Sequence, residues 1–212
     1  MKTFSPEQIN AMPACCNPDT SMGFRDYVII LLLLDTGIRV GELCGLTLDT
    51  VFLSIADQVF VKVLGKGRHQ REVGLISEVA QQLWKYVNVH RHPRDQDVKA
   101  VFLSRNGEPL TINGIQQLVQ EAGKRANIKG ARVSPHTFRH TFARMFLENG
   151  GDVYKLSVLL GHSSVVVIEN YLKDFESRSA RRVQSKHSPI AHLKLGRPKG
   201  NFKKSSTDML DE

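Results

Sequence analysis

The chain of 212 residues is long enough for one domain with a real core, and its 41% hydrophobic content is typical of a soluble globular protein. Its longest apolar run, residues 28–34, is far too short to span a bilayer, the N-terminus lacks the apolar stretch of a secretory signal, and the three cysteines form no CxxC pair. The net charge of +8 is unevenly placed, because residues 173–204 hold ten Lys and Arg against two Asp and Glu. These features favour a cytoplasmic protein with reduced thiols and a polyanionic partner.

The first part of the chain is predicted to be helical. Ser5 and Gln8 flank a proline and a glutamate in an S-x-x-Q capping box, which predicts a helix start. A second helix is expected at about 24–34, ending near a Thr-Gly pair. A third is expected to begin around Val40 and to carry Leu46 on its apolar face.

The hydrophobic pattern then changes to the alternation of β-structure. Residues 58–63 and 70–75 are β-rich and flank a glycine-containing turn at 65–67. Two short strands around such a turn predict a β-hairpin.

Helices and loops are predicted to follow the hairpin. A helix is expected from Ser77 to about Val87, followed by a polar loop at 90–99. Residues 101–103 are predicted as a short strand before an Asn-Gly turn, and residues 111–126 as a helix.

Three further helices are predicted in the remaining part. Ser134 and Pro135 repeat the cap-plus-proline start of a helix that runs to about Asn149, before a Gly-Gly stop. Asp152 is expected to cap a helix that ends at Gly161, and the next helix, opened by one of the two following serines, carries a tyrosine.

After residue 175 the apolar periodicity weakens and glycine, proline and basic residues dominate. We therefore expect one domain at 1–175 and a basic C-terminal extension at 176–212. The fold class predicted for the domain is α+β, predominantly α-helical, with a small antiparallel β-sheet.

Several polar residues sit in local frames suited to binding an anion. His136 and Arg139 are three apart on one predicted helix, near a terminus whose free N–H groups favour negative charge. Arg39 lies at a turn between helices, where Glu42 is placed to orient its guanidinium. Lys66 lies between two glycines at the hairpin tip.

Two more residues of this kind lie near the end of the predicted domain. His162 follows a glycine at the break between two helices, and Tyr171 comes nine residues later on the last one. Each signal alone has an ordinary structural explanation, since a histidine there suits a helix C-terminus and a tyrosine among apolar neighbours is usually core.

Together these segments resemble one family. Residues 36–43 (TGIRVGEL), 136–143 (HTFRHTFA) and 159–164 (LLGHSS) with Tyr171 are similar, in order and spacing, to the conserved boxes of tyrosine recombinases of the phage-integrase/Xer type. Residues 63–67 (VLGKG) resemble the lysine-bearing hairpin of that family. The resemblance covers roughly residues 4–175, the whole catalytic domain of the family.

The resemblance implies a site-specific recombinase that cleaves and rejoins duplex DNA with no metal and no cofactor. Tyr171 would be the nucleophile that forms a 3′-phosphotyrosyl bond and frees a 5′-hydroxyl. Arg39, Arg139 and His162 would hold the non-bridging oxygens as charge develops in the transition state.

The remaining roles follow in the same way from the resemblance. Lys66 would protonate the departing 5′-oxygen, His136 would assist proton transfer around the tyrosine hydroxyl, and Glu42 would support Arg39. The family acts on specific recombination sites in double-stranded DNA, as a tetramer and without a membrane, which implies a cytoplasmic, nucleoid-associated protein.

The chain differs from the family in three respects, one of which is the extended basic tail at 176–212, expected to serve assembly, DNA contact or both. The family usually has an N-terminal helical DNA-clamping domain, whereas this chain begins almost at the first catalytic-domain helix. Residues 165–167 are three valines where the family often has Thr-Thr. DNA contacts are expected from Arg68 at the hairpin tip, from Lys173, and from Arg197 in a short Gly-Arg-Pro stretch similar to an AT-hook.

Three other interpretations were compared with this one. Residues 152–171 also fit a non-catalytic helix-turn-helix DNA binder with Lys155 and Lys173 on phosphates, which leaves Arg39 and Lys66 unexplained. A type IB topoisomerase would use similar chemistry, but the chain length and the residues of the conserved boxes favour a recombinase.

A metal hydrolase is the third alternative. His136 and His140 are spaced i,i+4 on one helix, but Thr137 stands where a metalloprotease motif has glutamate. That alternative also needs a third ligand.

Overall fold

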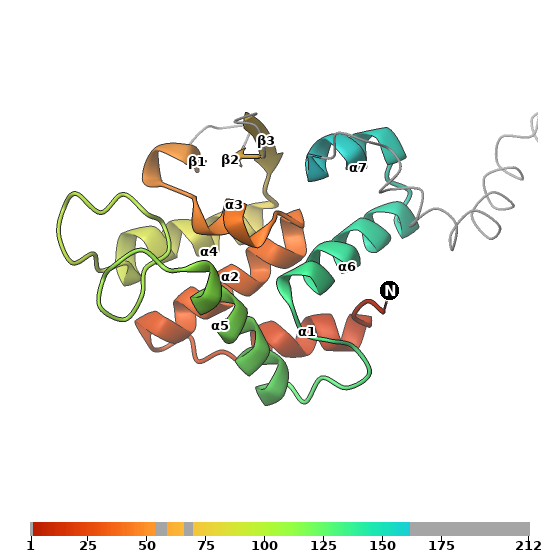
Figure 1. Ribbon diagram of the computed structural model, residues 1–212, viewed down its shortest axis with the longest axis horizontal. Helices are drawn as coiled ribbons and strands as arrows, with labels where there is room; N and C mark the ends of the chain where they lie inside the picture. Colours follow the sequence, from red (N-terminus) through yellow and green to blue (C-terminus); the bar gives the residue numbers. More distant parts are fainter. Residues whose placement is uncertain (1, 54–58, 66–69, 162–212) are drawn as a thin grey trace, which may run out of the picture. The chain divides into compact units, whose positions relative to one another are not determined.

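The computed structural model describes residues 2–53, 59–65 and 70–161 (Figure 1). The predicted last helix with its tyrosine, the hairpin tip and the expected domain boundary at 175 lie outside these residues. The described helices and strands are, in chain order, α1 (Pro6–Ala14), α2 (Ser21–Thr36), α3 (Val40–Cys44), β1 (Val51–Phe52), β2 (Phe60–Leu64), β3 (Gln70–Gly74), α4 (Ser77–Lys85), α5 (Ile112–Arg125), α6 (Pro135–Glu148) and α7 (Val153–Leu160).

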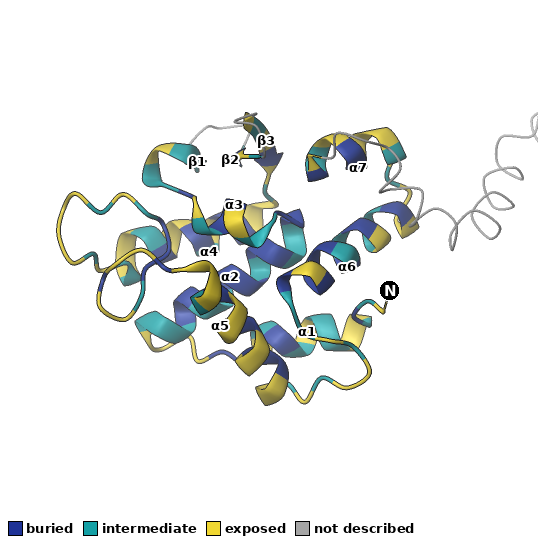
Figure 2. Ribbon diagram, in the orientation of Figure 1, coloured by how far each residue is buried: buried dark blue, intermediate teal, exposed yellow. Residues whose placement is uncertain are grey.

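Helix α2 is the centre of the core. It packs against α1, α4 and α6, and it is apolar on nearly every side, as expected for a helix surrounded by others (Figure 2). It begins three residues before the predicted start and ends two residues after the predicted end. No helix within the described ranges combines the length and the hydropathy needed to cross a membrane.

The predicted hairpin is confirmed and is part of a three-stranded antiparallel sheet in the order β1-β2-β3. Val61 pairs with Val73, and both are buried, whereas the neighbouring pair of Lys62 and Glu72 is more exposed. This alternation turns one side of the hairpin towards the core. Strand β1 was not predicted, because two residues are too few to produce a periodic pattern.

The predicted helix caps are confirmed. The side chains of Ser5, Ser134 and Asp152 each accept a hydrogen bond from a backbone N–H in the first turn of their helix. Thr111, predicted as the first residue of a helix, caps α5 in the same way. Helix α7 ends at Gly161 in the left-handed conformation, as its sequence indicates. These caps fix where α6 and α7 begin, and therefore which of their residues face the site.

Three predictions about the middle of the chain were wrong in detail. Residues 101–103 are buried but form no strand, because their backbone groups bond to two different segments: Val101 donates to Leu46, and Leu103 makes a single bridge with Pro109. Helix α3 ends at Cys44, so Leu46 lies beyond it, although it is still buried. Helix α4 continues into a π-helical turn to His90 instead of ending near 87.

Gly37 joins α2 to α3 at a place where a side chain does not fit. Its φ is +59°, and a Cβ atom there would lie 2.5 Å from Cδ1 of Phe142 on α6. We expect Gly37→Ala to lower the free energy of unfolding by about 2 kcal/mol, from left-handed strain plus overpacking. Urea denaturation measures this change.

Gly130 provides the matched control for that substitution. Its φ is +81°, but nothing lies within 4 Å of an added Cβ. Gly130→Ala should therefore show the backbone strain alone, about 1 kcal/mol. Equal losses at the two positions would contradict the predicted clash with Phe142.

Candidate active site

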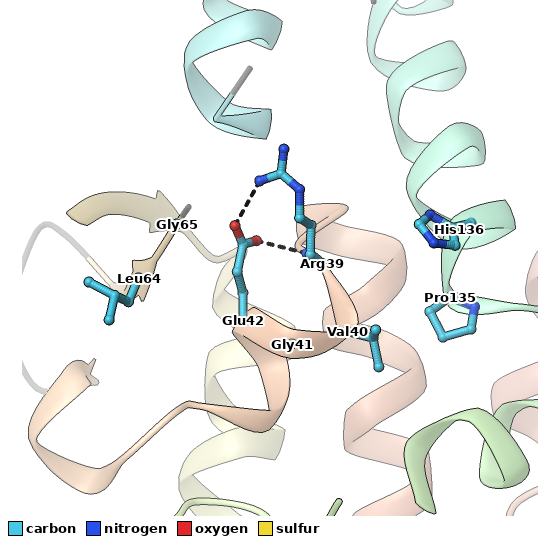
Figure 3. Close-up of a pocket in the computed structure, with 8 residues that line it drawn as sticks. All are labelled: Arg39, Val40, Gly41, Glu42, Leu64, Gly65, Pro135 and His136. Carbon is cyan, nitrogen blue, oxygen red and sulfur yellow. Dashed lines mark hydrogen bonds and ion pairs between the residues drawn. The ribbon is translucent and has the colours of Figure 1, made fainter. Parts of the chain in front are cut away.

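Three segments far apart in the sequence meet around one cavity of about 370 Å³ (Figure 3). They are the start of α3, the end of β2 and the start of α6. The lining residues are Arg39, Val40, Gly41, Glu42, Leu64, Gly65, Pro135 and His136. The cavity thus brings Arg39, His136 and the residue before Lys66 together.

Arg39 is fixed at the N-cap position of α3 by Glu42. The backbone N–H of Arg39 donates to Oε2 of Glu42 over 2.8 Å, and Nη1 of Arg39 donates to Oε1 over 2.9 Å. The Arg39 side chain remains 38% exposed, and it lies between Glu42 and His136 in Figure 3. A guanidinium held in this way at a cavity is placed to bind an anion.

His136 and Arg139 lie three residues apart on α6 but have different environments. His136 is exposed at the cavity, whereas Arg139 is only 6% exposed. Arg139 donates from Nη1 to the carbonyl of Gly37 over 2.9 Å and from Nη2 to that of Leu160 over 2.6 Å. The sequence placed both in the first turn of α6, but Arg139 is the fifth residue of the helix and reaches across to α7.

The C-terminal end of α7 is held by arginines from three different elements. Carbonyl groups in the last turn of a helix have no partner within the helix. Arg71 donates to the carbonyl of Leu159 over 2.7 Å, Arg139 to that of Leu160, and Arg39 to that of Gly161 over 3.2 Å. These bonds position the backbone immediately before His162.

Arg71 on β3 is a site residue that the sequence interpretation missed. Its Nη1 and Nη2 donate to Oε1 and Oε2 of Glu42 over 2.7 and 2.8 Å. One feature of the sequence could have identified Arg71 as a buried charged residue. Arg71 is two residues before buried Val73, so alternation turns it towards the core, where a charged side chain requires a partner.

The Glu42 carboxylate is ionised because of these partners. Burial alone would raise its pKa, but hydrogen bonds from Arg71 and Arg39 outweigh burial and hold the pKa below its usual value. The carboxylate side chain is 4% exposed. It is therefore a buried anion between two guanidinium groups.

The other predicted site residues lie outside the described ranges. They are Lys66, Arg68, His162, Tyr171, Lys173 and Arg197. Two of them directly follow a described residue. Lys66 follows Gly65, which lines the cavity, and His162 follows Gly161, whose carbonyl accepts a hydrogen bond from Arg39.

The histidine pair considered for a metal site does not gather further ligands in the described part of the chain. Within residues 2–53, 59–65 and 70–161, no three His, Cys, Asp or Glu side chains come together. His140 is half-buried, and burial, together with the nearby His136, lowers its pKa.

Comparisons with known proteins identify the family of the chain. The phage integrase family matches residues 2–178. Tyrosine recombinase XerD of Staphylococcus haemolyticus (strain JCSC1435) is 40% identical over 154 residues, which is 70% of this chain and 50% of that protein. The chain thus spans about half the length of the curated relatives it matches.

Solved structures show the same fold. The crystal structure of XerA recombinase matches with a TM-score of 0.73 and 28% identity, covering 89% of this chain and 64% of that one. The XerH site-specific recombinase bound to difH substrate matches with a TM-score of 0.75 and 19% identity, covering 87% and 54%. With its family boxes, its mostly helical fold and its small antiparallel sheet, the chain belongs to the phage integrase family of tyrosine recombinases.

Proposed function

We propose that this chain is the catalytic part of a site-specific recombinase that cleaves and rejoins duplex DNA through a 3′-phosphotyrosyl intermediate. The observation that carries the proposal is the cavity, which gathers Arg39, His136 and the residue next to Lys66, with Arg139 three residues after His136 on α6. A scissile phosphate in this cavity would meet cationic groups from three elements. Relatives of the same family act on DNA recombination sites, as the XerH complex with difH illustrates.

Strand cleavage in this proposal is an exchange of one phosphoester bond for another. The hydroxyl of Tyr171 attacks the phosphorus, the bond to the 5′-oxygen breaks, and a 3′-phosphotyrosyl bond forms. His136 accepts the tyrosine proton, and Lys66 donates a proton to the departing 5′-oxygen. Because the ester energy is kept in the covalent bond, a 5′-hydroxyl of another strand reverses the step without ATP.

Charge stabilisation falls to Arg39, Arg139 and His162. Negative charge develops on the non-bridging oxygens in the transition state, and preorganised guanidinium groups stabilise it without reorientation. The bonds of Arg39 to Glu42 and of Arg139 to backbone carbonyls support this role, because they hold both side chains before substrate arrives. Glu42 orients Arg39 and does not touch the phosphate.

The partners proposed for the whole protein are duplex recombination sites and further copies of itself, assembled as a tetramer on DNA. Basic contacts from Arg68, Lys173 and Arg197 would neutralise DNA phosphates, so that affinity should fall steeply with salt. The proposed location is the cytoplasm, at the nucleoid.

Covalent trapping on DNA tests the proposal. The protein and its Tyr171→Phe variant are incubated in EDTA with nicked suicide duplexes drawn from the ends of the element that carries the gene. We expect a denaturation-resistant protein–DNA adduct with the unsubstituted chain and none with Tyr171→Phe, because only the hydroxyl can form the phosphotyrosyl bond.

Each other outcome assigns a different function. An adduct that persists in Tyr171→Phe would identify another nucleophile. DNA binding without any adduct, also after a relative's N-terminal domain is supplied, would favour a non-catalytic DNA binder. Relaxation of supercoiled DNA without exchange of strands between duplexes would favour a topoisomerase.

A further inference from the structure

We propose that Arg71 is a positioning residue of the phosphate site, which aligns Arg39 through Glu42 and the segment before His162 through the carbonyl of Leu159. This inference rests on the proposed function, because it concerns the same site. Arg71 comes from β3, the strand that follows the hairpin tip carrying Lys66. Arg71 would thus hold Arg39 and the segment before His162 in fixed positions relative to β3.

The contact of Arg71 with Glu42 is bidentate. Both terminal nitrogens donate to separate carboxylate oxygens, over 2.7 and 2.8 Å, in the fork geometry that arginine alone among the side chains offers. Glu42 passes this constraint on, since Oε1 and Oε2 also accept from the side chain and the backbone of Arg39. The orientation of Arg39 at the cavity therefore depends on how firmly Arg71 holds Glu42.

The second contact of Arg71 reaches α7. Its Nε donates to the carbonyl of Leu159 over 2.7 Å, and the guanidinium packs closely against Gly161. A Cβ atom at Gly161 would lie 2.8 Å from Nη1 of Arg71, so the absence of a side chain there gives the guanidinium its room. Arg71 thus fits between Glu42 and the helix end that leads to His162.

The guanidinium of Arg71 is bonded to the protein in this structure. All three of its nitrogens have acceptors within the protein, its side chain is only 12% exposed, and it does not line the cavity. Arg39, by contrast, lines the cavity and is 38% exposed. The two arginines share one carboxylate but have different tasks: Arg39 faces the ligand, and Arg71 holds the carboxylate from the protein side.

The first test compares cleavage with DNA binding in Arg71→Lys and Arg71→Met. Lysine keeps the charge, but its donors all lie on one nitrogen and lack the planar fork that matches both carboxylate oxygens; methionine is apolar and removes the charge. We expect single-turnover cleavage of the nicked suicide duplex to fall about 100-fold in both variants, the loss typical of a displaced catalytic group. DNA affinity should change far less. Because removing one partner of a buried pair also destabilises the fold, cleavage is compared at a temperature where urea denaturation shows each variant to be folded.

The pH profile separates positioning from a purely structural role. Among the described residues, the charged groups that face the Glu42 carboxylate are Arg39 and Arg71. Loss of the Arg71 hydrogen bonds should raise the carboxyl pKa, since those bonds lower it now. The ratio of the cleavage rate of Arg71→Met to that of the unsubstituted chain should therefore fall as the pH decreases through the mildly acidic range, because only the variant has the raised carboxyl pKa.

A double-substitution cycle tests the route through Glu42. If Arg71 acts through the carboxylate, adding Arg71→Met to Glu42→Gln should cost little beyond Glu42→Gln alone. Lys62→Met is the matched control, because Lys62 is a cation of the same sheet whose partner, Glu72, is exposed. We expect this control to cleave like the unsubstituted chain.

Three results would overturn the inference. Normal cleavage by both Arg71 variants, or losses of cleavage that only follow losses of folding, would exclude a positioning role. Losses that multiply in the double variant would exclude the route through Glu42 that the inference states. In all three cases the unsubstituted chain still forms its Tyr171-dependent adduct, and the proposed function stands. If the unsubstituted chain forms no adduct, the proposed function is wrong, and this inference, which rests on it, is wrong as well.

Discussion

Replacing Arg39 with alanine is expected to reduce single-turnover cleavage by about 1000-fold, because one preorganised donor to the developing phosphate charge is lost. The side chain is 38% exposed and lines the cavity, so its removal should leave the core intact. Glu42 keeps its two bonds to Arg71 in this variant. Quench-flow measurement of adduct formation on the nicked duplex, with melting temperature measured in parallel, checks both statements.

Two further variants show whether the loss concerns geometry or charge alone. Arg39→Lys keeps the charge but not the planar fork, and we expect it to recover only a small part of the rate. Arg94→Ala removes one positive charge at an exposed site, where the side chain pairs with Glu108. If Arg94→Ala slows cleavage as much as Arg39→Ala, the effect of Arg39 is general attraction of DNA and not catalysis.

Replacing Glu42 with glutamine is expected to lower the free energy of unfolding by about 4 kcal/mol at neutral pH, because it leaves buried guanidinium charge without its counter-ion. The glutamate is 4% exposed, and Arg71, its bidentate partner, is 12% exposed. Urea denaturation of the two proteins gives the difference. Glu148→Gln is the matched control, since that exposed pair with Arg144 should contribute only about 0.5 kcal/mol.

The sign of the pH dependence follows from the direction of the pKa shift. The Glu42 pKa is lowered in the folded protein, so the unfolded chain binds the proton more readily. The contribution of the carboxylate is complete above the ordinary glutamate pKa of about 4.3 and is lost as the pH falls through the lower folded value. The gap between the unsubstituted chain and Glu42→Gln should close on acidification; a gap that is constant with pH would show that packing, and not charge, causes it.

Local signals in the sequence were sufficient for most of the secondary structure. Caps such as Ser5 and Asp152, and the left-handed glycine that ends α7, act within a few residues and so can be read from the chain. The predictions that failed concern residues whose secondary structure depends on partners far away in the sequence. Residues 101–103 have a strand-like composition, but no single strand pairs with all three of them. Strand β1 forms only because β2 lies beside it.

The sequence by itself determined the family and the candidate residues, because the boxes around Arg39, His136 and His162 keep their order and spacing along the chain. Only the tertiary structure decided which charged side chains pair with one another and with the end of α7. Glu42 and Arg71 are 29 residues apart, and Arg71 and Leu159 are 88 apart, so no local pattern connects them. Folding brings them together because β3 packs against α7 and its Arg71 reaches Glu42 on α3, and a buried carboxylate there is stable only with cationic partners.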